Sequence, residues 1–181
     1  MIPVMFRLQF ACGMRPQEVR RLKCLDFNFT KNTIYISESK KNKDRILAVR
    51  PEIMEMCRKY DCIARRLKQG RTYFFPSVRD SAYSAQSVTA MFHKCWKKAG
   101  NDISGRHCTP YDLRHAYASR VLMGWIEQGR DLDAYIPYLS TYMGHERFQD
   151  TYYYVHMLPQ RLSKMGFMEV RGIVPEVENE K

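Results

Sequence analysis

Three consecutive tyrosines, Tyr152 to Tyr154, follow a Gly-His pair in the stretch GHERFQDTYYYVH, residues 144–156. A phenol hydroxyl can act as a nucleophile, but its usual pKa of about 10 keeps it protonated at neutral pH. Such a nucleophile therefore needs a nearby base and a positively charged pocket to support its attack. Packing of the rings against a helix is the default alternative, because Tyr buries its ring while its hydroxyl stays near water.

Two segments in the first quarter of the chain could supply positive charge to such a pocket. Arg15 and Glu18 stand at positions i and i+3 of a predicted helix. The carboxylate can therefore hold the guanidinium so that its N–H groups point at an oxyanion. Lys40 begins a cationic turn, KKNKDR, whose long side chains can reach a ligand in a groove.

Two further candidates lie in the second half of the chain. Arg114, in TPYDLRH, stands one helical turn after Tyr111 and near the positive end of a predicted helix. His145 follows Gly144 at a predicted turn. Each of these local patterns alone is more typical of a surface ion pair than of a catalytic site.

Local patterns predict the elements that position these residues. Two short helices are expected over residues 3–12 and 16–23, because Gly13 can end the first and Pro16 can open the second. The β-branched, alternating segments NTIYISES and RILAV predict a β-hairpin with a cationic tip. YFFP could add a third strand.

The remaining segments favour helices. A long helix is expected from Pro51 to Gln69, ended by Gly70. Its predicted core face follows i, i+3, i+4 spacing: Ile53, Met56, Cys57, Tyr60, Ile63, Ala64 and Leu67. Further helices are predicted over residues 84–99, capped by Ser84, residues 109–129, capped by Thr109, residues 131–143, and a short segment after Gly144. The expected fold is α+β, mostly α-helical, with one small antiparallel three-stranded sheet.

Composition narrows the function. The 181 residues suit one domain able to bury roughly 70% of its unfolded surface. Residues 1–166 carry 28 Lys and Arg against 15 Asp and Glu, a net charge of +13, and the last fifteen residues are acidic. A cationic body favours a polyanion such as nucleic acid. The six cysteines show no spacing typical of a zinc site, so we expect reduced thiols, no metal and a cytoplasmic location. The apolar start is interrupted by Arg7 and is too short to span a membrane.

In this order and spacing, the patterns resemble the tyrosine recombinases, the phage integrase family that includes integrases of conjugative transposons. The resemblance is carried by ACGMRPQEVRRL, SKKNKDRILAV, TPYDLRHAYAS and YMGHERFQDTYYYVH. It implies a site-specific DNA recombinase or integrase of a mobile genetic element. Such an enzyme cuts and rejoins DNA strands through a 3′-phosphotyrosyl intermediate and needs neither metal nor cofactor.

The resemblance also implies roles for individual residues. Arg15, supported by Glu18, and Arg114 would bind the non-bridging oxygens of the scissile phosphate, where charge builds in the transition state. His145 would hydrogen-bond the same phosphate. Tyr154, nine residues later and within a Tyr-x-His context, would be the nucleophile.

The cationic hairpin is expected to act on the leaving group. Lys40 matches the family's lysine that protonates the departing 5′ oxygen, a general-acid role suited to an ammonium group. Lys41 and Lys43 are rivals for that role. The spacing of five residues before Arg45 favours Lys40, and the resemblance then leaves Lys41, Lys43 and Arg45 as DNA-binding residues.

Tyr111 departs from the family pattern. The family usually has His three residues before the second arginine, as acceptor of the tyrosyl proton, and Tyr is a poor base at neutral pH. His115 is turned by about 100° from Arg114 on helical geometry. His107 precedes the predicted helix and is a further candidate. The general base is therefore left open.

The resemblance implies partners and domains as well. We expect residues 1–166 to form the catalytic domain, and residues 167–181 to form a C-terminal tail that can dock on a neighbouring protomer. An upstream core-binding domain is expected outside this chain. The partner would be double-stranded DNA, bound by a homotetramer of the full-length protein, whereas this fragment would be a monomer without membrane contact. The alternatives are a cleavage-inactive DNA-binding relic and a type IB topoisomerase that relaxes DNA.

Overall fold

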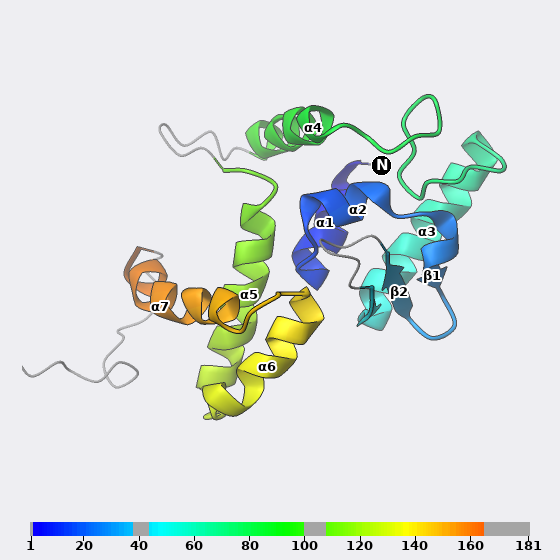
Figure 1. Cartoon of the computed structure of the whole chain (residues 1–181). Coiled ribbons are helices and arrows are strands. Elements are labelled where there is room, and N and C mark those ends of the chain that lie inside the picture. Colours follow the sequence, from blue (N-terminus) through cyan, green and yellow to red (C-terminus); the bar gives the residue numbers. More distant parts are fainter. Residues whose placement is uncertain (1, 38–43, 100–107, 165–181) are drawn as a thin grey trace, which may run out of the picture. The chain divides into compact units, whose positions relative to one another are not determined.

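The computed structural model describes three ranges, residues 2–37, 44–99 and 108–164 (Figure 1). These ranges contain seven α-helices and one three-stranded antiparallel sheet, which confirms the predicted α+β class. The hairpin lysines Lys40, Lys41 and Lys43, the candidate base His107 and the tail 167–181 lie outside the described residues.

The chain divides into two compact units. The first comprises Met1–Tyr117 together with Tyr142–Gly144, and the second comprises Ala118–Thr141 together with His145–Lys181. Helices α5, Asp112–Glu127, and α6, Leu132–Met143, contribute residues to both.

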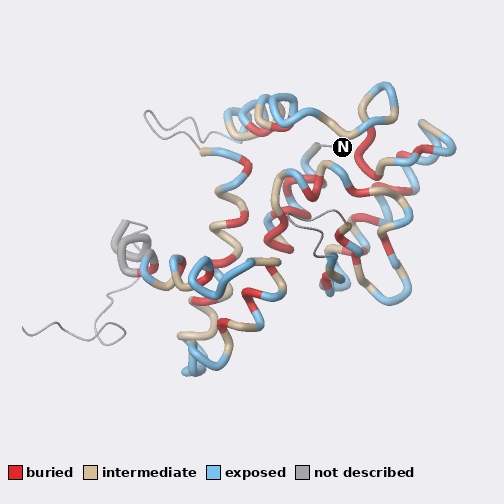
Figure 2. Tube along the Cα trace, viewed as in Figure 1, coloured by how far each residue is buried: buried red, intermediate tan, exposed pale blue. Residues whose placement is uncertain are grey.

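The first unit is built on α1, Ile2–Cys12, which packs against three other helices: α2, Pro16–Arg21, α3, Pro51–Leu67, and α4, Ala85–Lys98. Met5, Leu8 and Cys12 on α1 are buried. Figure 2 colours buried residues red along the chain trace. Ser84 caps α4 by accepting a hydrogen bond from the Ser87 N–H, as predicted. These helices form because their apolar residues recur at helical spacing and gain free energy by burial.

The sheet confirms the predicted hairpin and corrects the predicted third strand. Strands β2, Thr33–Ile36, and β3, Arg45–Ala48, pair antiparallel. The third strand is β1, Phe27–Asn28, and it pairs with β2.

The YFFP segment is not a sheet strand, and only Tyr73 makes an isolated bridge, to Lys23. Phe74 and Phe75 are both buried, so the segment lacks the alternation of a half-buried strand. The Phe74 ring stacks on Phe27 with centroids 3.8 Å apart. Aromatic packing and the two backbone hydrogen bonds of this bridge, from Phe74 N–H to Leu22 O and from Cys24 N–H to Thr72 O, therefore hold this segment outside the sheet.

Helix α3 forms as predicted, but its buried face is rotated from the predicted one. Ile63 and Leu67 are 58% and 72% exposed, whereas Asp61 is 5% exposed. Asp61 can be buried because its carboxylate pairs with the Arg71 guanidinium at 2.5 Å. Apolar periodicity alone could not reveal that a charged pair takes part of the core face.

The second unit contains most of α5 and α6 and the whole of α7, Gln149–Lys164. The segment predicted as a short helix is thus one helix of 16 residues. Helix α5 begins at Asp112, two residues past the predicted Pro110, and the predicted cap Thr109 donates from its N–H and its hydroxyl to the Asp112 carboxylate. Trp125 of α5 packs on Tyr135 of α6 with ring centroids 5.3 Å apart.

Gly13 joins α1 to α2 in a conformation that only glycine adopts without strain. Its φ is +62°, and a Cβ there would lie 2.3 Å from Cδ1 of Tyr117. Gly70, after α3, has a similar φ of +68° but no atom within 4 Å of such a Cβ. Gly70 is thus required only for its left-handed backbone conformation, whereas Gly13 is required for this conformation and for the lack of space beside it.

We expect Gly70→Ala to lower the free energy of unfolding by about 1 to 2 kcal/mol, the cost of a left-handed residue with a side chain. Gly13→Ala should cost a further ~1–3 kcal/mol, because the new methyl group must displace the Tyr117 ring. Denaturant unfolding of both variants measures the difference. Equal losses would show that the ring moves aside without cost.

Candidate active site

Arg15 is positioned in the first unit by the start of α2. Its backbone N–H donates to Glu18 Oε2 at 2.8 Å, and its Nη1 donates to Oε1 at 2.9 Å. The first of these bonds is one half of a helix capping box, with Glu18 in the first turn. The Arg15 side chain is 19% exposed and that of Glu18 is 5% exposed. The predicted support of Arg15 by Glu18 is thus present as a partly buried ion pair.

Arg114 lies in the first turn of α5 and is completely buried. Its Nη1 donates to the Gly13 carbonyl at 2.6 Å, and its Nη2 donates to the Met143 carbonyl at 2.8 Å. A buried guanidinium needs such acceptors, because an ion without hydrogen bonds in the core is strongly destabilising. Arg114 thus ties the α1–α2 connection to the end of α6.

Three arginines converge on consecutive carbonyl oxygens at that end of α6. Arg45 Nε donates to Tyr142 O at 2.9 Å, Arg114 Nη2 to Met143 O at 2.8 Å, and Arg15 Nη2 to Gly144 O at 2.6 Å. The last carbonyls of a helix lack partners within the helix and carry partial negative charge, so cations are favourable there. Arg15 and Arg114, far apart in the sequence, are therefore brought to adjacent peptide units.

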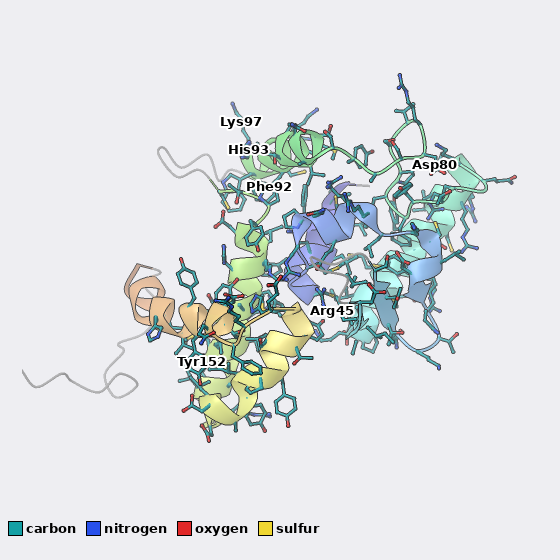
Figure 3. All side chains as sticks on the ribbon, in the orientation of Figure 1. Arg45, Asp80, Phe92, His93, Lys97 and Tyr152 are labelled. Carbon is teal, nitrogen blue, oxygen red and sulfur yellow. The ribbon has the colours of Figure 1, made fainter. Side chains whose placement is uncertain are left out.

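Glu18 also binds Arg45, the first residue of β3, which Figure 3 labels. Arg45 Nη1 and Nη2 donate to Glu18 Oε1 and Oε2 at 2.8 and 2.9 Å, in a bidentate pair. Burial alone would raise the pKa of Glu18, but the hydrogen bonds and charge of Arg45, with those of Arg15, hold this pKa below its usual value. Glu18 is therefore an ionised carboxylate shared by two arginines.

Tyr111 lies in the turn before α5 and is 43% exposed. An open groove is lined by Tyr111, Pro110 and Arg15, so the structure brings two predicted site residues to one surface of the first unit. The ring of His115 lies beside that of Tyr111, with centroids 5.2 Å apart. His115 thus stays within reach of the position where the family has a histidine.

The second unit brings together the other two predicted residues. His145 Nδ1 makes a hydrogen bond of 2.7 Å with the hydroxyl of buried Thr151. The imidazole ring stacks on Tyr154 with centroids 6.0 Å apart and planes inclined by 12°. Tyr154 is 5% exposed. The candidate nucleophile and the candidate phosphate ligand are therefore direct neighbours.

His145 is held by the turn that ends α6. Gly144 has a φ of +68°, and the His145 N–H donates to the Ser140 carbonyl at 2.9 Å. This bond and the left-handed glycine are the features of a Schellman cap. The Gly-His pair seen in the sequence is thus a helix C-cap that fixes the backbone at His145.

The two other tyrosines of the run differ from Tyr154. Tyr153 is 55% exposed, and its ring meets that of Tyr154 edge to face at 5.8 Å. Tyr152, labelled in Figure 3, donates its hydroxyl to Asp133 at 2.7 Å. That hydrogen bond to a carboxylate raises the pKa of Tyr152, which makes its phenolate harder to form.

Several of these contacts had no signal in the sequence. Gln9, on α1, is completely buried and donates to the Pro110 carbonyl at 2.7 Å, next to Tyr111. The contact of Thr151 with His145 and the carbonyls that accept hydrogen bonds from the arginines were also not predicted.

Among the described residues, no group of three or more His, Cys, Asp or Glu side chains could hold a metal ion. No helix in the described ranges is long and apolar enough to cross a membrane.

The chain is similar in sequence to several recombinases. A protein of Sinorhizobium fredii named as an integrase/recombinase, y4rE, is 32% identical over 152 residues, which cover 79% of this chain and 46% of the relative. The tyrosine recombinase XerA of Pyrococcus horikoshii is 26% identical over 86% of this chain and 50% of its own length. The chain thus spans about half the length of these relatives.

Solved structures share the fold. The XerA recombinase crystal structure superposes with a TM-score of 0.68 at 24% identity, covering 91% of this chain and 59% of that one. The Tn1549 transposon integrase in complex with transposon right end DNA gives 0.66 at 16% identity, covering 90% of this chain and 58% of that one.

The sequence profile of the phage integrase family matches residues 2–161, which is most of the chain. The segments that suggested the family lie within this range, including the two arginines and Tyr154. The chain therefore belongs to the phage integrase family.

Proposed function

We propose that this chain is the catalytic part of a tyrosine site-specific recombinase that cuts and rejoins DNA through a covalent 3′-phosphotyrosyl intermediate. The observation that carries the proposal is the convergence of Arg15 and Arg114 on adjacent carbonyls of one turn, directly before His145. Two fixed guanidinium groups of this kind suit the charge that builds on a phosphate during transfer. Membership of the phage integrase family and the cationic composition support the same conclusion.

The proposed reaction is a transesterification. The Tyr154 hydroxyl attacks the scissile phosphorus, a new P–O bond forms to the tyrosine, and the bond from phosphorus to the 5′ oxygen breaks. The tyrosyl proton passes to a base, and Lys40 supplies a proton to the departing 5′ oxygen. Rejoining reverses these steps with a 5′ hydroxyl, so the ester conserves the bond energy and neither metal nor cofactor is required.

The proposed substrate is double-stranded DNA. Structural neighbours include an integrase bound to transposon right end DNA and a lambda integrase dimer bound to a core site, at TM-scores of 0.66 and 0.59. Because the chain spans about half the length of its relatives, we propose that a further DNA-binding domain completes the full-length protein. We also propose a tetramer on DNA in which the tail 167–181 links protomers.

We predict that Tyr154→Phe abolishes covalent protein–DNA adducts, because only the hydroxyl that forms the ester is removed. The test uses a pool of nicked duplexes with randomised sequence around the nick, which traps adducts when the short 5′-hydroxyl fragment diffuses away. Adducts stable in SDS are isolated and their DNA is sequenced, and the enriched sequence then serves as a defined substrate.

Tyr153→Phe is the matched control, since Tyr153 is exposed and precedes the candidate nucleophile. It should retain adduct formation. Adducts that persist in Tyr154→Phe and disappear in Tyr153→Phe would move the nucleophile by one residue. A wild-type chain that binds DNA but forms no adduct would contradict the proposed reaction and favour a cleavage-inactive relic.

Arg15→Ala should reduce the adduct-forming rate by about 100- to 1,000-fold, the usual loss when one preorganised oxyanion donor is removed. DNA affinity should fall much less, because the donor acts mainly on the transition state. Arg66→Ala, which removes an exposed arginine of α3, is the control and should keep a rate near that of the wild type. Single-turnover rates on the defined substrate measure both. Equal losses in the two variants would show only a general dependence on positive charge.

Tyr111→His tests the position at which the family usually has a histidine. The side chain is 43% exposed and shares a groove with Arg15, so a histidine fits there without repacking the core. If the position accepts the tyrosyl proton, the variant should keep or raise the cleavage rate and add a pH dependence near neutrality, where imidazole titrates. A folded but inactive variant would show that Tyr111 has another role.

A further inference from the structure

Arg45 is more deeply engaged in the protein than a DNA-contacting arginine would be. Its side chain is 11% exposed. Its fork donates to both oxygens of Glu18, and its Nε donates to Tyr142 O at 2.9 Å. A planar guanidinium held at both ends has one allowed orientation, which lysine cannot reproduce.

Both groups that bind Arg45 are connected to Arg15. Glu18 Oε1 accepts from Arg45 Nη1 at 2.8 Å and from Arg15 Nη1 at 2.9 Å. Tyr142 belongs to the same turn as Gly144, whose carbonyl accepts from Arg15 Nη2 at 2.6 Å. Arg45 is therefore linked to the Arg15 guanidinium by two routes, each through one intermediate.

The turn and strand β3 are fitted closely together around Arg45. A Cβ at Gly144 would lie 2.8 Å from Arg45 Nη1, so a side chain there would displace the Arg45 guanidinium from this position. The Tyr142 hydroxyl donates to the Ala48 carbonyl of β3 at 3.0 Å. Both ends of β3 thus contact the Tyr142–Gly144 turn, which leaves little room for the turn to shift.

We propose that Arg45 is a positioning residue that sets the orientation of the Arg15 guanidinium through Glu18 and the Tyr142–Gly144 turn, without contacting DNA itself. The inference rests on the proposed function, in which Arg15 binds the scissile phosphate. It also connects strand β3 to the proposed phosphate pocket, because Arg45 is the first residue of this strand. A small misplacement of a catalytic group is enough to cost about 100-fold in rate.

The test compares Arg45→Gln and Arg45→Lys on the defined nicked substrate. Both should lower the single-turnover cleavage rate by about 10- to 100-fold, because neither side chain can hold Glu18 and Tyr142 O together. The affinity for DNA and its dependence on salt should not change. The control Arg66→Gln removes an exposed arginine of α3 and should leave the rate unchanged.

Two measurements separate positioning from the alternatives. In an Arg15→Ala background, Arg45→Gln should change the rate by less than about 2-fold, because the group that it positions is absent. If Arg45 instead contacts a DNA phosphate, its loss should weaken binding and reduce the slope of log K against log salt by about 1. The proposal would be overturned if the rate losses of Arg15→Ala and Arg45→Gln multiplied in the double variant. A reduced slope of log K against log salt for Arg45→Gln would overturn it as well.

Loss of folding is controlled by a second variant. Glu18→Gln breaks the same link from its other end, and if Arg45→Gln does not fold, this variant carries the test. Glu18→Gln should lower the cleavage rate by a similar factor. In the Arg15→Ala background, adding Glu18→Gln should leave the cleavage rate unchanged. Normal cleavage by folded Arg45→Gln or Glu18→Gln would overturn this inference alone, whereas a wild-type chain that binds DNA but forms no adduct would overturn the proposed function.

Discussion

The buried carboxylate of Glu18 is the interaction on which the first unit's site depends. A carboxylate removed from water is destabilising unless charged and hydrogen-bonding partners compensate it. Glu18 receives four hydrogen bonds, from the Arg15 backbone and side chain and from both ends of the Arg45 fork. These bonds keep its pKa low and at the same time fix two guanidinium groups. Stability and preorganisation thus come from the same contacts.

The end of α6 provides the second constraint. Its last carbonyls need donors, and Arg45, Arg114 and Arg15 fill three consecutive positions from Tyr142 to Gly144. The complete burial of Arg114 is compensated in the same way, because two backbone carbonyls, Gly13 O and Met143 O, accept from its guanidinium. Donors that are fixed before any substrate arrives are the arrangement that the proposed reaction needs to stabilise its transition state.

In the second unit, the ring of the proposed nucleophile Tyr154 is also packed in the interior. Tyr154 is buried and stacks on His145, so the default expectation of a packed aromatic residue is correct for its ring. The exposed Tyr153 and the Asp133-bonded Tyr152 have different surroundings, although all three are adjacent in the sequence. Helical geometry separates adjacent side chains by about 100°, so a run of identical residues meets three different environments.

The sequence by itself determined the α+β class, the β2–β3 hairpin, the position of most helices and the Arg15–Glu18 pair. All of these depend on local spacing, capping residues or neighbours within one helical turn. Only the tertiary structure decided that Phe27 and not YFFP supplies the third strand, that Asp61 displaces Ile63 from the core face of α3, and that Arg45 joins Glu18. Those outcomes depend on contacts between residues distant in the chain, and periodicity carries no information about which distant partner will satisfy a buried charge or a helix-end carbonyl.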